Sequence, residues 1–453
     1  MKFNASLDRI AASVLLALVV LVALTIVVGE GAGVRVRVDL PADSEVGPYQ
    51  VITFKFSEPI DSGIASDLIS LDPVHEGYLQ WVDDTTMRFV PLRPYEHDTV
   101  YTVILNAGEV AINGREVKKR QTWEFTIREP LVAYLLTDGV ESSIWSVDLN
   151  GGVPMRLTDA DIRVISFDAA QNGEFIIFTS ANVEGGIDLW RVNRDGSNAS
   201  ILLDCGLDRC TTPAIAPNGT RIAYSHEAAG PGPDLPFGSP RIWLLDLESG
   251  QNSPVYGSQL TLGYNPTWSP DSNKLASFDG LADRINLLDL EQKQQYAFPS
   301  NTGGPVTFSP DSNQFLFTNV EQTEDGLRTQ VRQADLALND SFTLIGAKDE
   351  RDYSYYSLAW SALENRAVLG FRASDEQPAL ILWVFNPGLL DGIVITNDPE
   401  YAYNSPQWDP WGTALIFQQF KLRGAYNPEI GLWRDGSIEP VIFAKGLMPH
   451  WLP

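Results

Sequence analysis

The feature that most constrains the fold is a short hairpin motif that recurs along the chain. An apolar strand, a Ser-Pro-Asp-Ser turn and a second apolar run make up Tyr264–Ser277 and, almost unchanged, Pro305–Phe317. Proline presets φ at the first central position of a turn, Asp can bond its own backbone, and Ser tolerates the next position. The copies follow one another at roughly 40–53 residues, a period that indicates stacked repeats. Variants of the motif lie at Phe167, Ile215, Trp360 and Trp408.

A second type of strand recurs beside these hairpins. It is exemplified by Ile144–Leu149 and Ile285–Leu290, and a polar turn and a short outer strand follow it. Units of four short antiparallel strands are typical of β-propellers, whose blades stand around a central channel. Seven copies of this strand begin at Ile144, Leu189, Ile242, Ile285, Val331, Ile381 and Ile430.

The two ends of the repeat region complement each other. Leu131–Leu136 begins the repeat in the middle of a unit, whereas Met448–Pro453 repeats the Pro-x-Trp sequence with no turn after it. Closure of the ring hides strand edges that would otherwise template aggregation. We therefore predict that Trp451 supplies the inner strand of the unit that contains Leu131–Thr158. The predicted fold of residues 131–453 is a seven-bladed β-propeller closed by the C-terminal strand, with six or eight blades as alternatives.

These repeats resemble the propeller repeats of the TolB type, on the Pro-x-Trp-Ser-Pro-Asp sequence and the strand that follows it. The resemblance covers residues 131–453 and is best at Trp268–Ser277 and Phe308–Phe317. Ser272 and Ser312 stand where that family prefers Gly. The resemblance implies a protein- or peptide-binding platform of the cell envelope. It leaves enzymes open, because the same fold serves as the gating domain of serine peptidases and occurs in some lyases.

Residues 34–128 predict a second all-β domain. Short alternating strands such as Val51–Phe56 and Thr99–Leu105 are separated by polar turns, at spacings that suit an antiparallel sandwich. The Phe54-Lys-Phe-Ser-Glu-Pro sequence and the Phe89-Val-Pro-Leu-Arg-Pro sequence resemble the bacterial Ig-like domains of the SbsA type. The resemblance implies a spacer with no catalytic residues, in which Phe54, Phe56 and Tyr101 belong to the core.

The N-terminal segment predicts a membrane anchor. Ile10–Val28 carries no charge and approaches the ~20 residues that span a bilayer. The sequence after it is a poor signal-peptidase site, so an uncleaved transmembrane helix over residues 10–29 is favoured over a cleaved signal peptide. Lys2 and Arg9 favour a cytoplasmic location for residues 1–9. The expected localisation is single-pass in the membrane, with the bulk of the chain extracytoplasmic.

Composition limits the partners and the chemistry. The net charge of −26 argues against nucleic acid, whose binding depends on clustered Lys and Arg. The two cysteines, Cys205 and Cys210, favour a local disulfide if the compartment is oxidising, and the four histidines leave little for metal binding. No nucleophile elbow, zinc motif, phosphate-binding loop or dinucleotide fingerprint occurs. We expect no catalytic residues, no metal, no cofactor and no enzyme activity.

Aromatic loops favour binding instead. Tyrosines gather before three of the inner strands, in loops expected on one propeller face, and Tyr presents a large amphipathic area at low entropic cost. The alternative is that they only cap the blades. The Pro/Gly-rich insertion His226–Pro240 projects from the same face as either a solvated loop or a lid. The predicted ligand-binding residues are Tyr264, Tyr353, Tyr355, Tyr356, Tyr401, Tyr403 and Phe237.

The sequence therefore predicts a membrane-anchored extracytoplasmic binding or scaffold protein. One propeller face is expected to engage a protein, peptide or glycan of the cell envelope. The alternative function is a propeller lyase or hydrolase that acts on polysaccharide.

Overall fold

The structure is a computed structural model of the chain. It describes residues 13–16, 18–19, 33–40, 45–97, 99–137, 139, 141–232, 235–257, 261–323, 326–346, 354–372 and 379–453. The chain folds into two compact units, Met1–Arg128 and Glu129–Pro453. Each unit is described by itself below.

The predicted membrane anchor is not supported. Within residues 10–29 the structure describes a helical stretch at residues 13–16 and 18–19 only. Among all described residues, no helix combines the length and the apolar character that crossing a bilayer requires. The prediction of a single-pass membrane protein is corrected accordingly, because it depended on such a helix.

The first unit is a sandwich of two antiparallel-rich sheets, built on alternating buried and exposed residues. Phe54 and Tyr101 are buried in its core as expected, and Tyr101 stacks on Phe125 with the ring centroids 5.4 Å apart. Helix α2 (Ser62–Leu68) and the hairpin of β8 (Gly108–Glu109) and β9 (Glu116–Val117) complete it. The sheets run β1 (Val36–Asp39), β3 (Ile52–Phe56), β6 (Thr86–Pro91), β5 (Gly77–Trp81), and β2 (Glu45–Val46), β10 (Gln121–Ile127), β7 (Tyr101–Leu105), β4 (Ile69–Asp72).

The second unit repeats one antiparallel arrangement, in which an inner strand, two middle strands and an outer strand follow one another. Most of these sheets have four strands, and two successive sets join into an eight-stranded sheet through a single parallel bridge between Ile187 and Arg209. The eight-stranded sheet holds β14 (Val164–Ala169), β15 (Phe175–Ala181), β16 (Ile187–Asn193), β17 (Ser200–Leu203), β18 (Arg209–Ile215), β19 (Arg221–Glu227), β20 (Arg241–Asp246) and β21 (Asn252–Pro254). The four-stranded sheets that follow hold β22 (Tyr264–Trp268), β23 (Lys274–Asp279), β24 (Arg284–Asp289), β25 (Gln294–Pro299); β26 (Thr307–Phe308), β27 (Gln314–Thr323), β28 (Gly326–Asp335), β29 (Asp340–Ile345); β30 (Ser354–Trp360), β31 (Ala367–Arg372), β32 (Ile381–Phe385), β33 (Gly392–Val394); and β34 (Tyr401–Trp408), β35 (Ala414–Lys421), β36 (Glu429–Arg434), β37 (Val441–Lys445).

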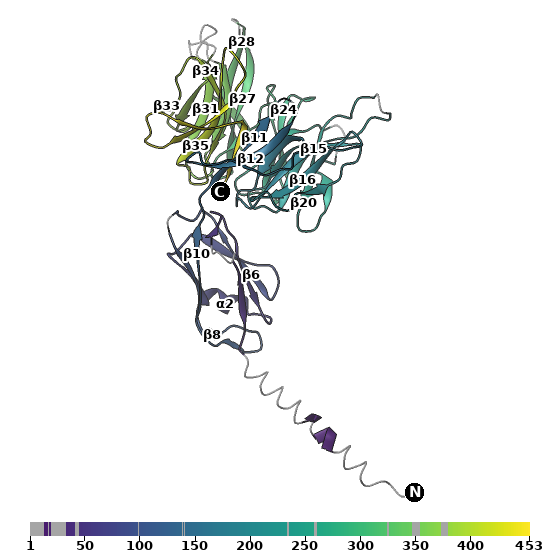
Figure 1. Ribbon diagram of the computed structural model, residues 1–453, viewed down its shortest axis with the longest axis vertical. Coiled ribbons are helices and arrows are strands. Elements are labelled where there is room, and N and C mark those ends of the chain that lie inside the picture. Colours follow the sequence, from purple (N-terminus) through teal and green to yellow (C-terminus); the bar gives the residue numbers. More distant parts are fainter. Residues whose placement is uncertain are drawn as a thin grey trace. The chain divides into compact units, whose positions relative to one another are not determined.

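One further sheet joins the two ends of this unit. It holds β11 (Leu131–Thr137), β12 (Ser142–Asp148), β13 (Met155–Arg156) and, from the other end of the chain, β38 (Leu447–Leu452). Strand β38 lies antiparallel to β11, with Trp451 opposite Val132, which is the pairing that the sequence predicted. Figure 1 shows β11 and β12 beside the late strand β35, and Val132 shares an apolar cluster with Ile416 of that strand.

The core of the second unit is divided among the seams between successive sets of strands. Phe315, for example, packs against Phe298 of the preceding sheet, with ring centroids 5.1 Å apart. Because the last cluster joins Ile416 and Leu432 to Trp451, the succession returns to its beginning. This cyclic arrangement is that of a β-propeller. Among the described residues, seven apolar clusters occupy these seams.

The Ser-Pro-Asp-Ser turns link neighbouring sheets as well as neighbouring strands. Ser272 and Ser312 adopt left-handed φ values of 61° and 60°, the conformation for which Gly is usual. Each hydroxyl accepts a hydrogen bond from the turn before it: Asn218 donates its N–H to Ser272 Oγ at 3.0 Å, and Asp271 donates to Ser312 Oγ at 3.1 Å. A serine in this conformation is more strained than a glycine would be. Its hydroxyl contributes a hydrogen bond to the neighbouring sheet, which a glycine could not form.

The Pro-x-Trp sequence follows a β-bulge in the inner strand. The residue before the proline has a left-handed φ, as in Asn265 at 49° and Ser405 at 51°, and the pairing register shifts there. The proline fixes its own φ directly after the bulge. The same conformation occurs at Thr212, Ser357 and Met448.

Candidate functional site

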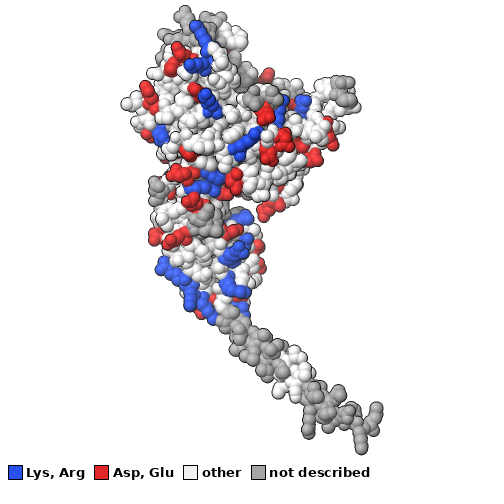
Figure 2. Space-filling model, in the orientation of Figure 1, with Lys and Arg blue, Asp and Glu red and all other residues white. Residues whose placement is uncertain are grey.

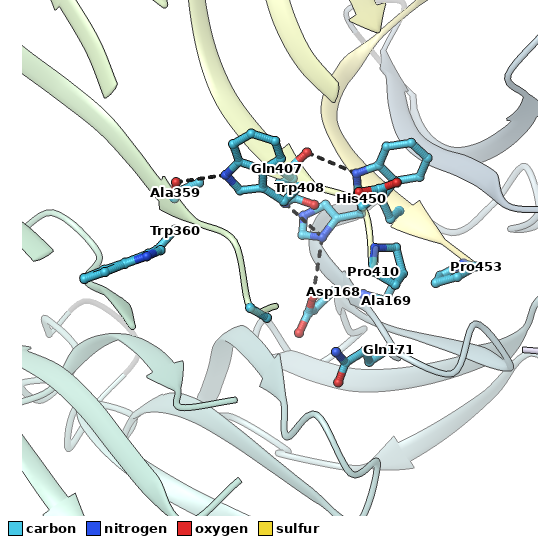
Figure 3. A pocket seen from close by; sticks show the side chains of 13 residues that line it. Asp168, Ala169, Gln171, Ala359, Trp360, Gln407, Trp408, Pro410, His450 and Pro453 are labelled. Carbon is cyan, nitrogen blue, oxygen red and sulfur yellow. Dashed lines mark hydrogen bonds and ion pairs between the residues drawn. The ribbon is translucent and has the colours of Figure 1, made fainter. Parts of the chain in front are cut away.

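A cavity of about 320 Å³ opens at the turn end of the inner strands, where several sheets converge (Figure 3). A neighbouring cavity of about 170 Å³ shares Gln171, Trp360 and Ala362 with it. Between them, the two cavities take residues from every sheet of the propeller. The larger one is lined by Asp168, Ala169, Gln171, Ala359, Trp360, Ala362, Gln407, Trp408, Asp409, Pro410, His450, Trp451 and Pro453.

Equivalent backbone positions supply three of the polar side chains of this cavity. The hydrogen bond from Ala170 N to Phe175 O matches that from Ser269 N to Lys274 O, so Ala169 stands where Trp268 stands. Phe167, which the sequence suggested as the equivalent of that Trp, lies two residues earlier in β14. The residue just before the Trp position is then Asp168 in β14, Gln407 in β34 and His450 in β38.

Asp168 and His450 meet at the cavity. His450 Nδ1 lies 3.4 Å from Asp168 Oδ1 and 3.3 Å from Gln407 Nε2. One ring nitrogen cannot donate to the carboxylate and accept from the amide at once, so the tautomer of His450 selects between these partners. Asp168 Oδ2 also accepts the N–H of Ile215 at 2.7 Å. The pair thus joins β38, β14 and β18.

Tryptophans form the apolar walls and tie the inner strands together. Each indole N–H reaches the preceding inner strand: Trp268 donates to Ala214 O at 3.0 Å, Trp408 to Ala359 O at 3.2 Å, and Trp451 to Gln407 O at 3.0 Å. Trp360 differs from these three. The residue is only 7% exposed, and its Nε1 is buried without a hydrogen-bond partner. The Trp360 backbone N–H instead donates to Thr307 Oγ1 at 2.6 Å.

Asp409 lines the cavity but is committed to its own turn. Its Oδ1 accepts the N–H groups of Thr413 and Ala414 at 2.8 and 3.1 Å, and its Oδ2 accepts the Thr413 hydroxyl at 3.0 Å. Burial raises the pKa of the Asp409 carboxyl above its usual value, against the hydrogen bonds that lower it. Asp409 and Ser269 have the same role in their turns, since the side chain of each accepts the N–H of the residue five positions later. In the second case Lys274 N–H donates to Ser269 Oγ.

The predicted tyrosines that the structure describes lie at the other end of the inner strands. Tyr264 and Tyr356 are about two-fifths exposed, at 39% and 40%, and Tyr401 is half-buried. Tyr355 and Tyr403 are only 4% exposed. The bulky rings fill seams in the core. Tyr353 lies outside the described residues, and ligand binding by the tyrosines and Phe237 stays a prediction.

The insertion and the cysteines form one structure. Cys205 and Cys210 are bonded to each other, and the loop between them carries Asp208 and Arg209. Asp208 Oδ2 is 3.0 Å from His226 Nε2, and the Arg209 guanidinium lies 3.6 Å from the centre of the Phe237 ring. Phe237 is therefore folded back onto the disulfide loop instead of standing at a free tip.

The part of the chain that the structure describes contains no cluster of side chains that would bind a metal ion. No group of three or more His, Cys, Asp or Glu side chains there is placed to hold a metal ion. Sequence reasoning missed Asp168, Gln171, Gln407 and His450 as site residues. The signal was present: a polar residue precedes the Trp position in β34 and β38.

Comparisons with known proteins agree with this architecture. Residues 34–127 match the family model of a bacterial Ig-like domain. In the solved structures, a puromycin-hydrolyzing peptidase of Mycobacterium tuberculosis matches with a TM-score of 0.52 at 13% identity, covering 70% of this chain and 53% of that one. TolB from Acinetobacter baumannii matches with a TM-score of 0.43 at 17% identity, covering 71% and 82%. Residues 34–127 are thus a bacterial Ig-like domain, and the structural neighbours of the chain include TolB and other β-propeller proteins.

Two further comparisons cover a lyase and a curated relative. An oligogalacturonate lyase of Vibrio parahaemolyticus has a TM-score of 0.42 at 12% identity, covering 63% of this chain and 74% of that one. An uncharacterized protein of Agrobacterium fabrum, Atu1656, is 30% identical over 139 residues, which are 29% of this chain and 45% of that protein. The chain thus spans about half the length of the curated relative that it matches.

Proposed function

We propose that the propeller is a binding module that takes a protein or peptide segment at the cavity between its inner strands. The eight-stranded sheet counts as two blades in this proposal, which gives seven blades in all, one for each apolar seam. The observation that carries the proposal is the convergence of Asp168, Gln171, Gln407 and His450 on one open cavity with tryptophan walls.

The chemistry of the lining suits a polypeptide. Amide side chains such as Gln171 and Gln407 can both donate to and accept from peptide groups, and indole surfaces pack apolar side chains. A cavity of about 320 Å³ is at the lower end of the ~300–1,000 Å³ that ligand pockets span, which is room for one or two side chains. Its described lining includes no Ser, Thr, Tyr, Cys or Lys that could serve as a nucleophile.

A second candidate function is a lyase or hydrolase acting on polysaccharide, and one observation favours it. The 3.4 Å contact between His450 Nδ1 and Asp168 Oδ1 is the arrangement by which a carboxylate orients an imidazole base. Turnover of a polysaccharide panel that is lost in His450→Gln supports this function. The peptide proposal instead expects no turnover.

Peptide selection tests the proposed function. A random peptide library is selected on the full-length protein, and the dissociation constants of the enriched peptides are measured by calorimetry. Ala362 is exposed and lines both cavities, so Ala362→Trp should fill the opening, leave folding intact and weaken binding at least tenfold. Tyr264→Ala is the matched control, at the opposite end of an inner strand.

Three results are informative. Loss of binding in Ala362→Trp alone supports the cavity. Loss in Tyr264→Ala or Tyr356→Ala alone moves the binding surface to the tyrosine end. Failure to enrich any peptide, together with glycan turnover, favours the second candidate.

A further inference from the structure

We infer that the bound segment inserts a basic side chain, arginine or lysine, into the larger cavity, where its charged group pairs with the carboxylate of Asp168. This inference rests on the proposed function and deepens it, since it names the residue type that the cavity selects. It is carried by the charge of the lining, by the unused acceptor capacity of Asp168 and by the indole walls.

Among Asp, Glu, Lys and Arg, only acidic side chains line the cavity. Asp168 and Asp409 are its carboxylates, and neither cavity is lined by Lys or Arg. The whole chain carries a net charge of −26. On the face of the molecule that Figure 2 shows, acidic and basic side chains are interspersed, whereas the lining of the two cavities holds acidic ones without Lys or Arg. A cation is the ligand that such a lining attracts.

Asp168 is the carboxylate that can reach a ligand. Its side chain is 24% exposed, whereas Asp409 is only 8% exposed and accepts three hydrogen bonds from its own turn. An ionised carboxylate offers about four acceptor positions. Asp168 Oδ1 accepts the N–H of Ala169 at 2.9 Å and lies near His450, while Oδ2 accepts that of Ile215 at 2.7 Å. Acceptor capacity therefore remains at Oδ2.

The walls suit the rest of a basic side chain. Trp360, Trp408 and Trp451 offer indole surface along which the methylene stem of Arg or Lys can pack, and a guanidinium plane can stack on an indole edge or face. The amide oxygens of Gln171 and Gln407 can accept further N–H groups. Figure 3 shows Asp168, Gln171 and Trp360 around the same opening. Arginine, with five donors, uses more of these acceptors than lysine.

Amino-acid derivatives of matched shape test this inference on the full-length protein. The probes are N-acetyl-arginine methylamide and its citrulline counterpart, which has nearly the same shape without the charge. Binding is followed by NMR through the indole N–H signals, assigned with Trp→Phe variants. We expect arginine to shift the signals of Trp360, Trp408 and Trp451, to bind at least tenfold more tightly than citrulline, and to weaken as salt screens the charge.

Two variants localise the charge. Asp168→Asn removes the carboxylate charge, and Gln171→Lys places a fixed cation at the opening without touching the Asp168 hydrogen bonds. Each should weaken arginine binding at least tenfold, whereas Asp271→Asn, an exposed turn position outside the lining, should leave it unchanged. An unaltered indole spectrum of each variant, apart from signals at the cavity, shows that the fold is intact.

The outcomes separate this inference from the proposed function. Equal binding of arginine and citrulline, or arginine binding that survives in Gln171→Lys, overturns the inference that the cavity selects a basic side chain. Enriched peptides that bind the cavity without Arg or Lys overturn the inference and leave the proposed function standing. Arginine binding with no peptide binding supports the cation site and overturns the proposed peptide-binding function.

Discussion

The two ends of the inner strands differ in how they are built. At the turn end, one sequence motif repeats, and equivalent atoms make equivalent contacts, such as the indole N–H groups of Trp268, Trp408 and Trp451. At the loop end, the connections have no common sequence, and their tyrosines range from 4% to 40% exposed. The repeated end carries the cavity, and the unrepeated end carries the disulfide and the folded-back insertion.

The difference teaches that a repeated motif can create a site at the ring centre from residues that the motif itself does not specify. The motif fixes where the residue before each Trp position lies, and its identity is then free to vary. Asp, Gln or His occupies this position in three strands, and a smaller residue occupies it in others: Asp168, Gln407 and His450 against Ala214, Thr267 and Ala359. Asymmetry in a symmetric scaffold thus defines the site.

The largest expected effect concerns the loop end. Tyr403 is buried in a seam, and burial raises its pKa to about 12. Tyr403→Ala should lower the free energy of unfolding by about 3–5 kcal/mol, as for other buried aromatic side chains. Tyr356→Ala, at an exposed ring, should change it by less than about 0.5 kcal/mol. Urea denaturation measures both, and similar losses would erase the distinction between core and surface tyrosines.

An intermediate effect tests the indole contacts at the turn end. Trp268→Phe removes an N–H that bonds Ala214 O, whereas Trp360→Phe removes one that has no partner. Both variants shrink the ring equally, so their difference isolates the hydrogen bond. Trp268→Phe should be the more destabilising by about 1–2 kcal/mol in thermal or urea unfolding. The reverse order would show that Trp360 Nε1 is satisfied.

The smallest effect is in pH dependence, and its sign differs between two turns. The pKa of Asp409 is raised by burial, so its contribution to stability is present below pH 3.8 and lost as pH rises through its folded pKa. Burial alone would raise the pKa of the Asp271 carboxyl. The hydrogen bonds from Lys274, Ser269 and Asn273 together have the larger effect, so the pKa is lowered. Its contribution is present above pH 3.8 and lost as pH falls through its folded pKa.

Asn variants of the two turns give the measurement. The stability of the natural protein relative to Asp409→Asn should decline as pH rises above 3.8, and relative to Asp271→Asn it should decline as pH falls below that value. Urea denaturation across this range follows both differences. Slopes of the same sign would contradict the assignment of opposite shifts.

Local sequence predicted the repeat well, because turn residues and alternating apolar residues act over a few positions. The pairing of Trp451 with the strand at Leu131 also followed, from counting strands at the two ends. The site did not follow. Asp168 and His450 are distant in the sequence and meet only through ring closure, and the burial of Tyr403 depends on Phe417 of the next strand, 5.8 Å away between ring centres. The predicted membrane anchor is not supported, because no helix among the described residues is long and apolar enough to cross a bilayer.

The pairing of β38 with β11 has a consequence for biosynthesis. Leu131 meets Leu452, so the first propeller sheet to leave the ribosome stays three-stranded, with one edge of β11 open, until nearly the whole propeller has been made. Contacts so distant in the sequence form late, because their loop-closure entropy must be overcome first. A nascent chain that stalls before Leu447 therefore exposes an unpaired strand, and this species is the one most in need of a chaperone.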